Sequence, residues 1–546
     1  MKNSFGTIDY LVFLGYCALI IFIGLFVSRN KKGSKKTATD YFLASKALPW
    51  WAIGSSLIAA NISAEQYIGM SGSSYAIGLA MASYEWIAAL GLLVVGIFIL
   101  PVFLKKNIYT MPQFLEKRFD NRVRVALATF WLLVYVFVNL TSVMWLGALA
   151  LNTIIGIPVF WGILGLALFA AIYSIYGGLK AVAWTDVIQV VFLIGGGLVT
   201  TYLALNALGA GDGALAGFAY LKEQVPEKFH MIIHKGDLMV PDINGNLKDA
   251  WTILPGLSVI IGGIWVANIA YWGFNQYIIQ RGLAAKSIAE AQYGVVFAGF
   301  LKLLIPLIVV IPGIAAFLIA KDPAAYGLQD IDPITRSDQA YPWLLQHFVP
   351  VGIKGLAFAA LVAAIVSSLA SMLNSTATIF TLDIYKTYIN RNVSEVNMVK
   401  VGRITSLVAL VIAVCAAQPL LGSLDQAFQF IQEFTGFITP GVCAIFLFGL
   451  FWKRTTANAA LWGVGLSIPL SFLFLVFVPG LPFMNRWGVV FLILSAIMIA
   501  LSLIGSKADH PKAVVLERGF FHTTTRFKVW AILLTGVVAA LYILFW

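Results

Sequence analysis

The chain has 546 residues, of which 60% are apolar and only 11% are charged, and its mean hydropathy is +0.89. Soluble domains carry about 25% charged residues, so this composition excludes a soluble enzyme of several domains, and the 14% of aromatic residues excludes a disordered chain. The formal net charge of +12 fits either a nucleic-acid partner or a membrane surface, so the positions of the charges must decide between them.

Mainly apolar stretches of about 20 residues recur along the whole chain, and each is long enough to cross a hydrocarbon core of roughly 30 Å. They predict an all-α membrane protein with about fourteen transmembrane helices. In chain order these helices are expected at 8–28, 49–78, 80–104, 125–152, 158–178, 182–206, 252–279, 290–320, 350–382, 398–420, 424–452, 456–479, 487–506 and 529–546. The two long connections, 207–251 and 321–349, are expected to hold short surface helices instead of separate domains.

The basic residues are distributed unequally between alternate connections. With the N-terminus placed outside, most of the 36 lysine and arginine residues, including Arg281, fall in connections on the inside, as the positive-inside rule requires. Acidic residues gather in the two long outside connections. The chain is therefore predicted to be a multi-pass protein of the plasma (inner) membrane with both termini outside. The lipid bilayer, and not nucleic acid, accounts for its charge.

Two of the expected helices contain polar residues near their middle. The second contains Ala59–Gln66 (AANISAEQ), and the seventh contains Gly262–Asn268 (GGIWVAN), followed by Tyr271, Asn275 and Gln276. Five helices separate their starting points, so the two cross the membrane in opposite directions, which is the pattern of two inverted halves whose first helices are broken. Unwound backbone frees carbonyl oxygens for a cation and is tolerated only where it lines a cavity. The alternative is that both segments are polar patches at contacts between helices.

Ionisable side chains also occur within or at the edge of the expected helices, where each charge costs at least ~2.5 kcal/mol. They are Glu65, Glu85, Asp186, Lys302 and Glu433. Amides at similar depth have two interpretations, because a single amide commonly bonds neighbouring helices, whereas a group of them favours a shared polar cavity. The amides are Asn61, Gln66, Asn139, Asn268, Asn275, Gln276, Gln429 and Gln432.

The ninth expected helix carries the adjacent pair Ser367 and Ser368. Serine hydroxyls in membrane helices commonly bond back to a carbonyl one turn earlier. A pair that faces an unwound helix would instead offer two hard oxygens to a small cation such as sodium. The residues alone leave both interpretations open.

Motifs for other energy sources and for catalysis are missing from the sequence. There is no Gly-x-x-x-x-Gly-Lys-Ser/Thr loop for ATP, and there is no His-Glu-x-x-His, Gly-x-Ser-x-Gly or Cys-x-x-Cys motif. The chain is therefore not expected to be an enzyme, and transport without ATP is the function that remains.

Four segments carry long motifs in a fixed order. They are Ser55–Met70 (SSLIAANISAEQYIGM), Tyr173–Ala181 (YSIYGGLKA), Asn275–Ser287 (NQYIIQRGLAAKS) and Ala363–Tyr385 (AAIVSSLASMLNSTATIFTLDIY). Together they closely resemble the sodium/solute symporter family, and within it the bacterial sodium/galactose and sodium/glucose cotransporters. The resemblance extends over essentially the whole chain and implies the LeuT-type fold of two inverted five-helix repeats. The implied division is 1–48 (extra N-terminal helix and inside loop), 49–206 (first repeat), 207–251 (outside loop), 252–452 (second repeat) and 453–546 (three peripheral helices).

The resemblance also implies which residues bind the ion and the solute. The implied sodium ligands are the carbonyls of Ala59, Ile62 and Ala364 and the hydroxyls of Ser367 and Ser368. Asp186 matches a carboxylate near the path of the ion. The residues that match sugar ligands are Gln66, Glu85, Asn268, Lys302 and Gln432, with Tyr271 stacked under the ring as the inner gate and with Asn61 and Ser63 in the same region. Met70, Tyr84 and Phe428 match an outer hydrophobic gate.

Two positions depart from the family pattern. Ala370 stands where members that use two sodium ions carry a hydroxyl residue, which favours one ion per sugar. Ala88 stands where the resembled cotransporters carry a serine that contacts the sugar, so one interaction is weakened or sugar preference is altered.

The sequence therefore predicts sodium-coupled symport of a neutral sugar, galactose and/or glucose, into the cell by alternating access, with Na⁺ as the coupling ion. A polyol presents hydroxyls that both donate and accept, so amides, a carboxylate and an ammonium can satisfy it, while an aromatic face covers its C–H surface. The alternatives are sodium-driven uptake of myo-inositol, sialic acid or an amino acid, and a sugar sensor that does not transport.

Overall fold

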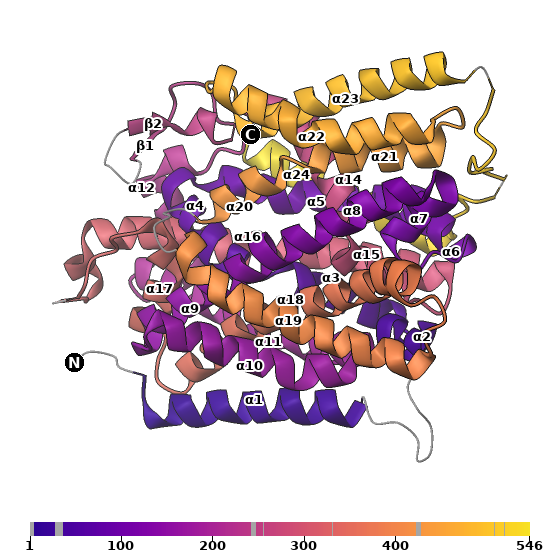
Figure 1. The fold of residues 1–546 in the computed structure, drawn as a ribbon. Helices are drawn as coiled ribbons and strands as arrows, with labels where there is room; N and C mark the ends of the chain where they lie inside the picture. Colours follow the sequence, from indigo (N-terminus) through magenta and orange to yellow (C-terminus); the bar gives the residue numbers. More distant parts are fainter. Residues whose placement is uncertain are drawn as a thin grey trace.

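The computed structural model of the protein describes residues 5–27, 37–241, 247–254, 256–329, 331–421, 427–506, 508–517 and 519–546. Helices make up most of this part of the chain, and the long ones lie side by side in one bundle (Figure 1). One small antiparallel sheet pairs strand β1 (Met239–Pro241) with strand β2 (Leu247–Asp249), with Val240 opposite Lys248. Helices dominate because a helix satisfies its own backbone polar groups, as a chain in lipid requires.

Among the described residues, eleven helical segments are long and apolar enough to span a membrane, and a bent pair of helices makes twelve if it counts as one span. Seven of the eleven are single helices: α1 (Thr7–Val27), α11 (Leu179–Leu208), α16 (Ile288–Lys321), α19 (Glu395–Leu421), α22 (Ala457–Phe477), α23 (Phe483–Gly505) and α24 (Thr525–Leu544). The other four are composite: Leu79–Lys105 contains α5 (Ser83–Val94) and α6 (Leu100–Lys105), and Asn121–Ile155 contains α8 (Asn121–Val134) and α9 (Thr141–Ile155). Ile353–Ile389 contains α18 (Ile353–Ile379), and Ile431–Phe451 contains α21 (Thr439–Phe451), which follows α20 (Ala427–Thr435). The prediction of an all-α membrane protein is confirmed.

Six further helices occupy the rest of the predicted spans. They are α3 (Trp50–Asn61), α4 (Ser71–Ile77), α10 (Val159–Gly177), α13 (Gly256–Ile261), α14 (Gly263–Phe274) and α15 (Gln276–Leu283). The bent pair is α13 and α14, which meet at 76°. Helices α3 and α4 are each too short to cross a membrane, and the apolar part of α10 is shorter than the other spans.

Short elements cover the two ends of the bundle (Figure 1). Helices α12 (Ala214–Gln224) and α17 (Ala340–Phe348) and the two strands lie at the end where α1 begins. Helices α2 (Ala38–Leu43) and α7 (Met111–Arg118) lie at the opposite end. The prediction of short helices in the two long connections is confirmed by α12 and α17.

Helix α3 ends where polar side chains compete with the backbone for hydrogen bonds. Ile62, the residue after the helix, is extended, with φ −82° and ψ 109°. The N–H and the hydroxyl of Ser63 both donate to the side-chain oxygen of Gln66, at 2.9 and 3.2 Å, and the N–H of Glu65 donates to the Ser63 hydroxyl at 3.0 Å. Such local bonds are the reason that serine and asparagine favour helix ends. The chain then resumes as a π-helical turn that leads into α4.

The seventh expected span is interrupted twice, at Gly262, where α13 and α14 meet within the polar segment, and at Asn275, between α14 and α15. Helix α14 is continuous through Asn268, whose side-chain amide donates to the Ile264 carbonyl at 2.9 Å. The second interruption comes at Asn275, which is extended, with φ −80° and ψ 121°, and whose side-chain oxygen accepts the Tyr135 hydroxyl. An amide that bonds within its own helix leaves that helix intact, whereas the amide of Asn275 bonds across to another helix.

Small residues let the broken segments lie close to their neighbours. A Cβ atom on Gly54 of α3 would lie 2.7 Å from the Gly294 carbonyl oxygen of α16. A Cβ atom on Gly196 of α11 would lie 2.7 Å from the Cβ of Ala360 on α18. Close backbone approach is the main source of helix packing in lipid, where burial of apolar surface gives little. Helix α3 is thus in contact with α11, α16 and α18.

Candidate functional site

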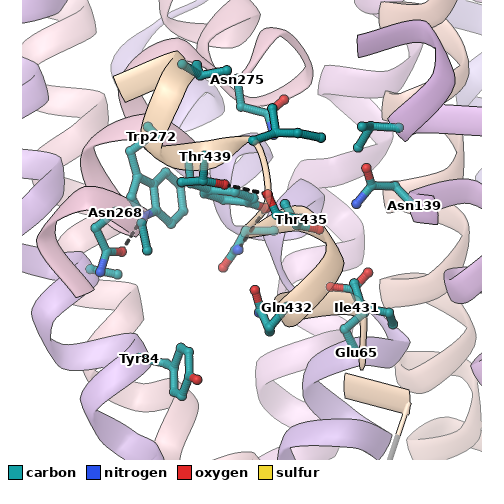
Figure 2. A pocket seen from close by; sticks show the side chains of 18 of the residues that line it. Glu65, Tyr84, Asn139, Asn268, Trp272, Asn275, Ile431, Gln432, Thr435 and Thr439 are labelled. Atoms are coloured by element: carbon teal, nitrogen blue, oxygen red, sulfur yellow. Dashed lines mark hydrogen bonds between the residues drawn. The ribbon is translucent and has the colours of Figure 1, made fainter. Parts of the chain in front are cut away.

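A cavity of about 130 Å³ lies inside the bundle (Figure 2). It is next to the break after α3 and the break at Asn275, because Asn61 and Asn275 both line it. It is lined by all but one of the side chains that the sequence analysis assigns to the solute, namely Asn61, Gln66, Glu85, Asn268, Tyr271, Lys302 and Gln432. The exception is Ser63, which instead holds Gln66 through the two bonds described above. Met70 and Tyr84 of the expected outer gate also line the cavity, and the side chain of Phe428 lies outside the described residues.

A buried ion pair forms part of the cavity wall. Lys302 of α16 donates to the carboxylate of Glu85 on α5 and to the side-chain oxygen of Asn61 at the end of α3. The exposed fractions of Lys302 and Glu85 are 1% and 2%, and the Lys302 ammonium lies 5.1 Å from the centre of the Trp272 ring. Each charge offsets the desolvation penalty of the other. The three polar side chains therefore offer donors and acceptors in fixed orientations.

Asn61 also connects this ion pair to two tyrosines. Its amide donates to the Tyr271 hydroxyl at 3.0 Å, and that hydroxyl lies 2.7 Å from the hydroxyl of Tyr277. The Tyr271 ring packs edge-on against Trp272, with 5.2 Å between the ring centres. Tyr271 belongs to α14 and Tyr277 to α15, so the contact between their hydroxyls bridges the break at Asn275.

Other polar side chains surround the same space. In Figure 2, Asn268 and Tyr84 lie on one side of the view and Glu65 and Asn139 on the other, with Gln432 between them. Asn268 accepts the indole N–H of Trp272 at 3.2 Å, which fixes its amide within α14. The cavity therefore contains a second carboxylate, that of Glu65, in addition to that of Glu85.

The serine pair lies on α18, beside the end of α3. The Ser368 hydroxyl donates to the Ala60 carbonyl at 3.0 Å, and the Ser367 hydroxyl donates to a carboxylate oxygen of Asp186 at 2.6 Å. All of these residues are buried. A hydroxyl has one proton and two lone pairs, so each serine hydroxyl donates its one hydrogen bond within the protein and retains lone pairs as an acceptor.

Arg281 occupies a different place from the one that its position in the sequence indicates. The charge pattern predicts that Arg281 lies in an inside connection, but its side chain is fully buried. Its Nε donates to the Ser56 hydroxyl at 2.8 Å, and its Nη2 lies 3.5 Å from an oxygen of Asp186. The reason is that α15 continues to Leu283, past the predicted end of the span, and carries the guanidinium into the protein.

Residues 41–466 match the sodium:solute symporter family, which is most of the chain. The chain belongs to this family. The symporter is 53% identical over 555 residues to the sodium/glucose cotransporter of Vibrio parahaemolyticus, covering 100% of this chain and 99% of that protein. It is 31% identical over 488 residues to sodium/myo-inositol cotransporter 2 of Homo sapiens, covering 86% of this chain and 70% of the other. The solved outward-open structure of a substrate-bound, Na⁺-coupled sialic acid symporter is similar, with a TM-score of 0.78, 26% identity, and coverage of 92% and 98% of the two chains.

Family membership decides several of the predictions made from the sequence. The resemblance carried by the four motif segments is confirmed, because the matched range contains all of them. The protein is a multi-pass membrane transporter and not an enzyme. The roles of individual side chains in binding the sugar and the ion stay predictions.

Several residues that line the symporter's cavity were missed by the sequence analysis. They are aromatic or hydroxyl side chains of the fourth and eleventh expected spans: Phe130, Trp131, Tyr135, Thr435 and Thr439. In an apolar helix such residues resemble those that face lipid, because they carry no charge that demands a partner. Tyr135 had one detectable signal, since a hydroxyl in the middle of a span needs an acceptor, and its acceptor is Asn275.

Proposed function

We propose that this protein carries a neutral sugar, glucose and/or galactose, together with sodium across the cytoplasmic (plasma) membrane into the cell. The observation that carries the proposal is the cavity in which Lys302, Glu85 and Asn61 face the rings of Tyr271 and Trp272. Such a lining suits a polyol, whose hydroxyls both donate and accept and whose ring has apolar faces. The 53% identity to a named sodium/glucose cotransporter supports the same substrate class.

The proposed sodium site lies between α3 and α18. Its ligands are the carbonyls of Ala59, Ile62 and Ala364 and the hydroxyls of Ser367 and Ser368. In support, Ser368 donates to the carbonyl of Ala60 in the last turn of α3, and because both serine hydroxyls already donate a hydrogen bond, their lone pairs are the groups left for an ion. Carbonyl and hydroxyl oxygens are the ligands that hard cations prefer.

The proposed number of ions rests on a neighbouring position. Ala370 has no side-chain oxygen, and its carbonyl accepts the Ser174 hydroxyl at 3.1 Å. Asp186 is likewise engaged by Ser367 and Arg281. Both observations support one sodium ion per sugar.

The proposed topology keeps the fourteen spans that the sequence predicts. Eleven single segments and the bent pair α13–α14 account for twelve. We add α10 and the broken pair α3–α4 as the other two. The first inverted repeat then covers 49–206 and the second 252–452, with 1–48 before them, the loop 207–251 between them, and three peripheral helices in 453–546. Both termini are proposed to be outside. In support, α1 begins at the end of the bundle where α12 and α17, from the two long outside connections, also lie (Figure 1).

The proposed mechanism is alternating access. Sodium from outside orders the break after α3 and favours the outward-open state, the sugar enters, and the outer gate of Met70, Tyr84 and Phe428 closes. Sodium release inside loosens the break, and the sugar leaves past Tyr271. The ion couples because it prefers one state, since a ligand with equal affinity for both shifts nothing. A membrane potential adds about 2.3 kcal/mol per charge per 100 mV.

A second candidate substrate is myo-inositol, because one relative is named as a sodium/myo-inositol cotransporter. Inositol carries one hydroxyl more than a hexopyranose, which has a ring oxygen in that place, and it also has apolar ring faces. A carboxylated solute fits less well. Of the described residues that line the cavity, Lys302 is the only basic one, and it is already paired with Glu85.

The test is uptake of labelled glucose, galactose and inositol into proteoliposomes with an inward sodium gradient. Wild-type protein is expected to accumulate glucose or galactose, and Gln66→Ala and Ser368→Ala are expected to lose most of this uptake. Accumulation of inositol alone would replace the sugar assignment. Equal uptake with a proton gradient and no sodium would contradict the coupling ion.

A further inference from the structure

Asp186 of α11 is the centre of a fully buried polar cluster behind the proposed sodium site. Its two carboxylate oxygens accept the hydroxyls of Ser56, at 2.5 Å, and of Ser367, at 2.6 Å. The guanidinium of Arg281 carries the opposite charge but lies farther away, with 3.5 Å between Nη2 and the carboxylate. The two serines therefore make the short contacts with the carboxylate, and the ion pair with Arg281 is the longest of the three contacts.

Other acceptors hold Arg281 in this position. One end of the guanidinium donates to the Tyr277 carbonyl one turn earlier on α15, and the other donates to the Ser371 hydroxyl of α18. Its Nε donates to the hydroxyl of Ser56 on α3 at 2.8 Å. An arginine offers five donors in one rigid plane, which suits it to join several helices at once. Arg281 thus ties the inner half of the second broken helix to the two helices that carry the proposed sodium ligands.

The same turn of α15 reaches the sugar cavity. Tyr277 and Arg281 are four residues apart, so they lie on one face of the helix. The Tyr277 hydroxyl lies 2.7 Å from the hydroxyl of Tyr271, the proposed inner gate, and Asn61 donates to Tyr271 at 3.0 Å. A displacement of Arg281 along this helix therefore acts directly on the tyrosine pair.

From these contacts we infer that Arg281 couples the sodium site to the inner sugar gate, as a cation held between the two. This inference rests on the proposed function. With sodium bound beside Ser367, the charge of Asp186 is balanced and Arg281 stays on Tyr277 and Ser371. When sodium leaves, the guanidinium moves closer to Asp186, with Nη2 leading and Nη1 drawn away from Tyr277. The bond to the Tyr277 carbonyl is given up, α15 shifts, and the contact between Tyr277 and Tyr271 opens.

This arrangement satisfies the condition that any coupling between two sites must meet. Each site has to bias the same two-state element, and the coupling works in both directions. Here the element is α15, which carries Arg281 toward the ion and Tyr277 toward the sugar. Arg281 is a positioning residue, because it is not among the described residues that line the cavity and it contributes no ligand to the ion.

The test measures the KM for sugar at low and at high sodium in proteoliposomes. In the wild type, high sodium lowers the sugar KM. Tyr277→Phe keeps the guanidinium but removes the contact between the two tyrosine hydroxyls. Its half-saturating sodium concentration is therefore expected to stay within about twofold of the wild-type value, while the ratio of sugar KM at low sodium to sugar KM at high sodium falls to near one. Arg281→Gln removes the competing cation, so the half-saturating sodium concentration falls by about fivefold or more and the change in sugar KM is also lost. Arg281→Lys keeps the charge but not the planar set of guanidinium donors, so the sodium-dependent change in sugar KM is expected to lie between those of the wild type and Arg281→Gln.

Matched controls separate coupling from loss of a buried polar group. Arg118 is buried and donates to the Gly449 carbonyl at 2.8 Å, and the buried Tyr67 hydroxyl donates to the Leu193 carbonyl at 2.5 Å. Arg118→Gln and Tyr67→Phe are expected to keep the wild-type dependence on sodium. If Arg281→Gln does not elute as a folded protein, Tyr277→Phe and Arg281→Lys decide the question.

The outcomes distinguish this inference from the proposed function. Wild-type uptake with no dependence on sodium would overturn the proposed function, and the inference with it. Sodium-dependent wild-type uptake, with Tyr277→Phe and Arg281→Lys that both retain the full sodium-dependent change in sugar KM, would overturn the inference alone.

Discussion

Lys302 of α16 donates to the carboxylate of Glu85 on α5 in the interior of the bundle, where both side chains are almost completely buried. Removal of one partner leaves the other charge without compensation. Lys302→Ala is therefore expected to reduce the free energy of unfolding by about 3–5 kcal/mol, measured by thermal unfolding in detergent, and to abolish uptake.

The double variant Lys302→Met/Glu85→Gln is the control for this prediction. It removes both charges together, so it is expected to regain most of the lost stability but none of the transport. A Lys302→Ala protein as stable as the wild type would show that the pair does not hold two charges at this depth.

Asp9 of α1 anchors the first helix to the start of α18. It is fully buried, and one carboxylate oxygen accepts the backbone N–H groups of Gly352 and Gly355, each at 2.7 Å. An anion at a helix N-terminus is stabilised by the helix dipole and by the free N–H groups. Asp9→Ala leaves these donors unpaired and is expected to cost about 1–3 kcal/mol of stability, with an unchanged sugar KM. Asp322→Ala, in the exposed loop after α16, is the control and should leave the unfolding temperature nearly unchanged.

The connection 207–251 contributes a pH-dependent contact through Lys228. Its ammonium donates to the carbonyls of Tyr75, at 3.2 Å, and Ala76, at the end of α4, and burial lowers the pKa of Lys228 to about 8. An unfolded lysine has a pKa of roughly 10.4. Between these two values the unfolded chain binds more protons than the folded one, so this residue's contribution to stability rises with pH.

Lys228→Met removes that contribution. The difference in unfolding temperature, wild type minus variant, is expected to increase between pH 7 and pH 10, as measured by thermal unfolding at several pH values. Lys222→Met is the matched exposed control from the same loop. A difference that decreases as the pH rises would mean that the charged contact to the α4 carbonyls outweighs the burial of the ammonium.

The parts of this molecule that the sequence predicts well are those that lipid constrains locally. A span must be apolar, and a charge within it must be paired, so the positions of the helices and the importance of Lys302 and Glu85 could be recognised without a structure. The burial of Arg281 could not, because α15 extends only a few residues past an apolar run and its guanidinium is indistinguishable from a loop charge. Partners such as Ser371 lie far away in sequence and meet Arg281 only through packing.

Ala88 lines the cavity on α5, one turn after Glu85. Ala88→Ser adds a hydroxyl to the wall of the proposed sugar cavity, and one net hydrogen bond is worth about 1 kcal/mol, so the sugar KM is expected to fall by about fivefold. Ala89→Ser is the control, because Ala89 is buried on the same helix but is not among the described residues that line the cavity. An equal change in both variants would show that the effect comes from packing of α5, and sugar uptake kinetics provide the measurement.

Ser367 provides a test of the proposed sodium site, because its hydroxyl bonds differently from an ordinary hydroxyl of a membrane helix. Its hydroxyl donates to Asp186 at 2.6 Å, whereas Thr376, farther along α18, donates back to the Met372 carbonyl at 2.8 Å. Hydrogen bonds and ligand contacts to charged groups are worth about 1.5–3 kcal/mol. Ser367→Ala is therefore expected to raise the half-saturating sodium concentration for uptake by at least about tenfold, while Thr376→Val changes it by less than about twofold. If the two variants respond equally to sodium, the serine pair has the same structural role as Thr376, and the ion must be bound elsewhere.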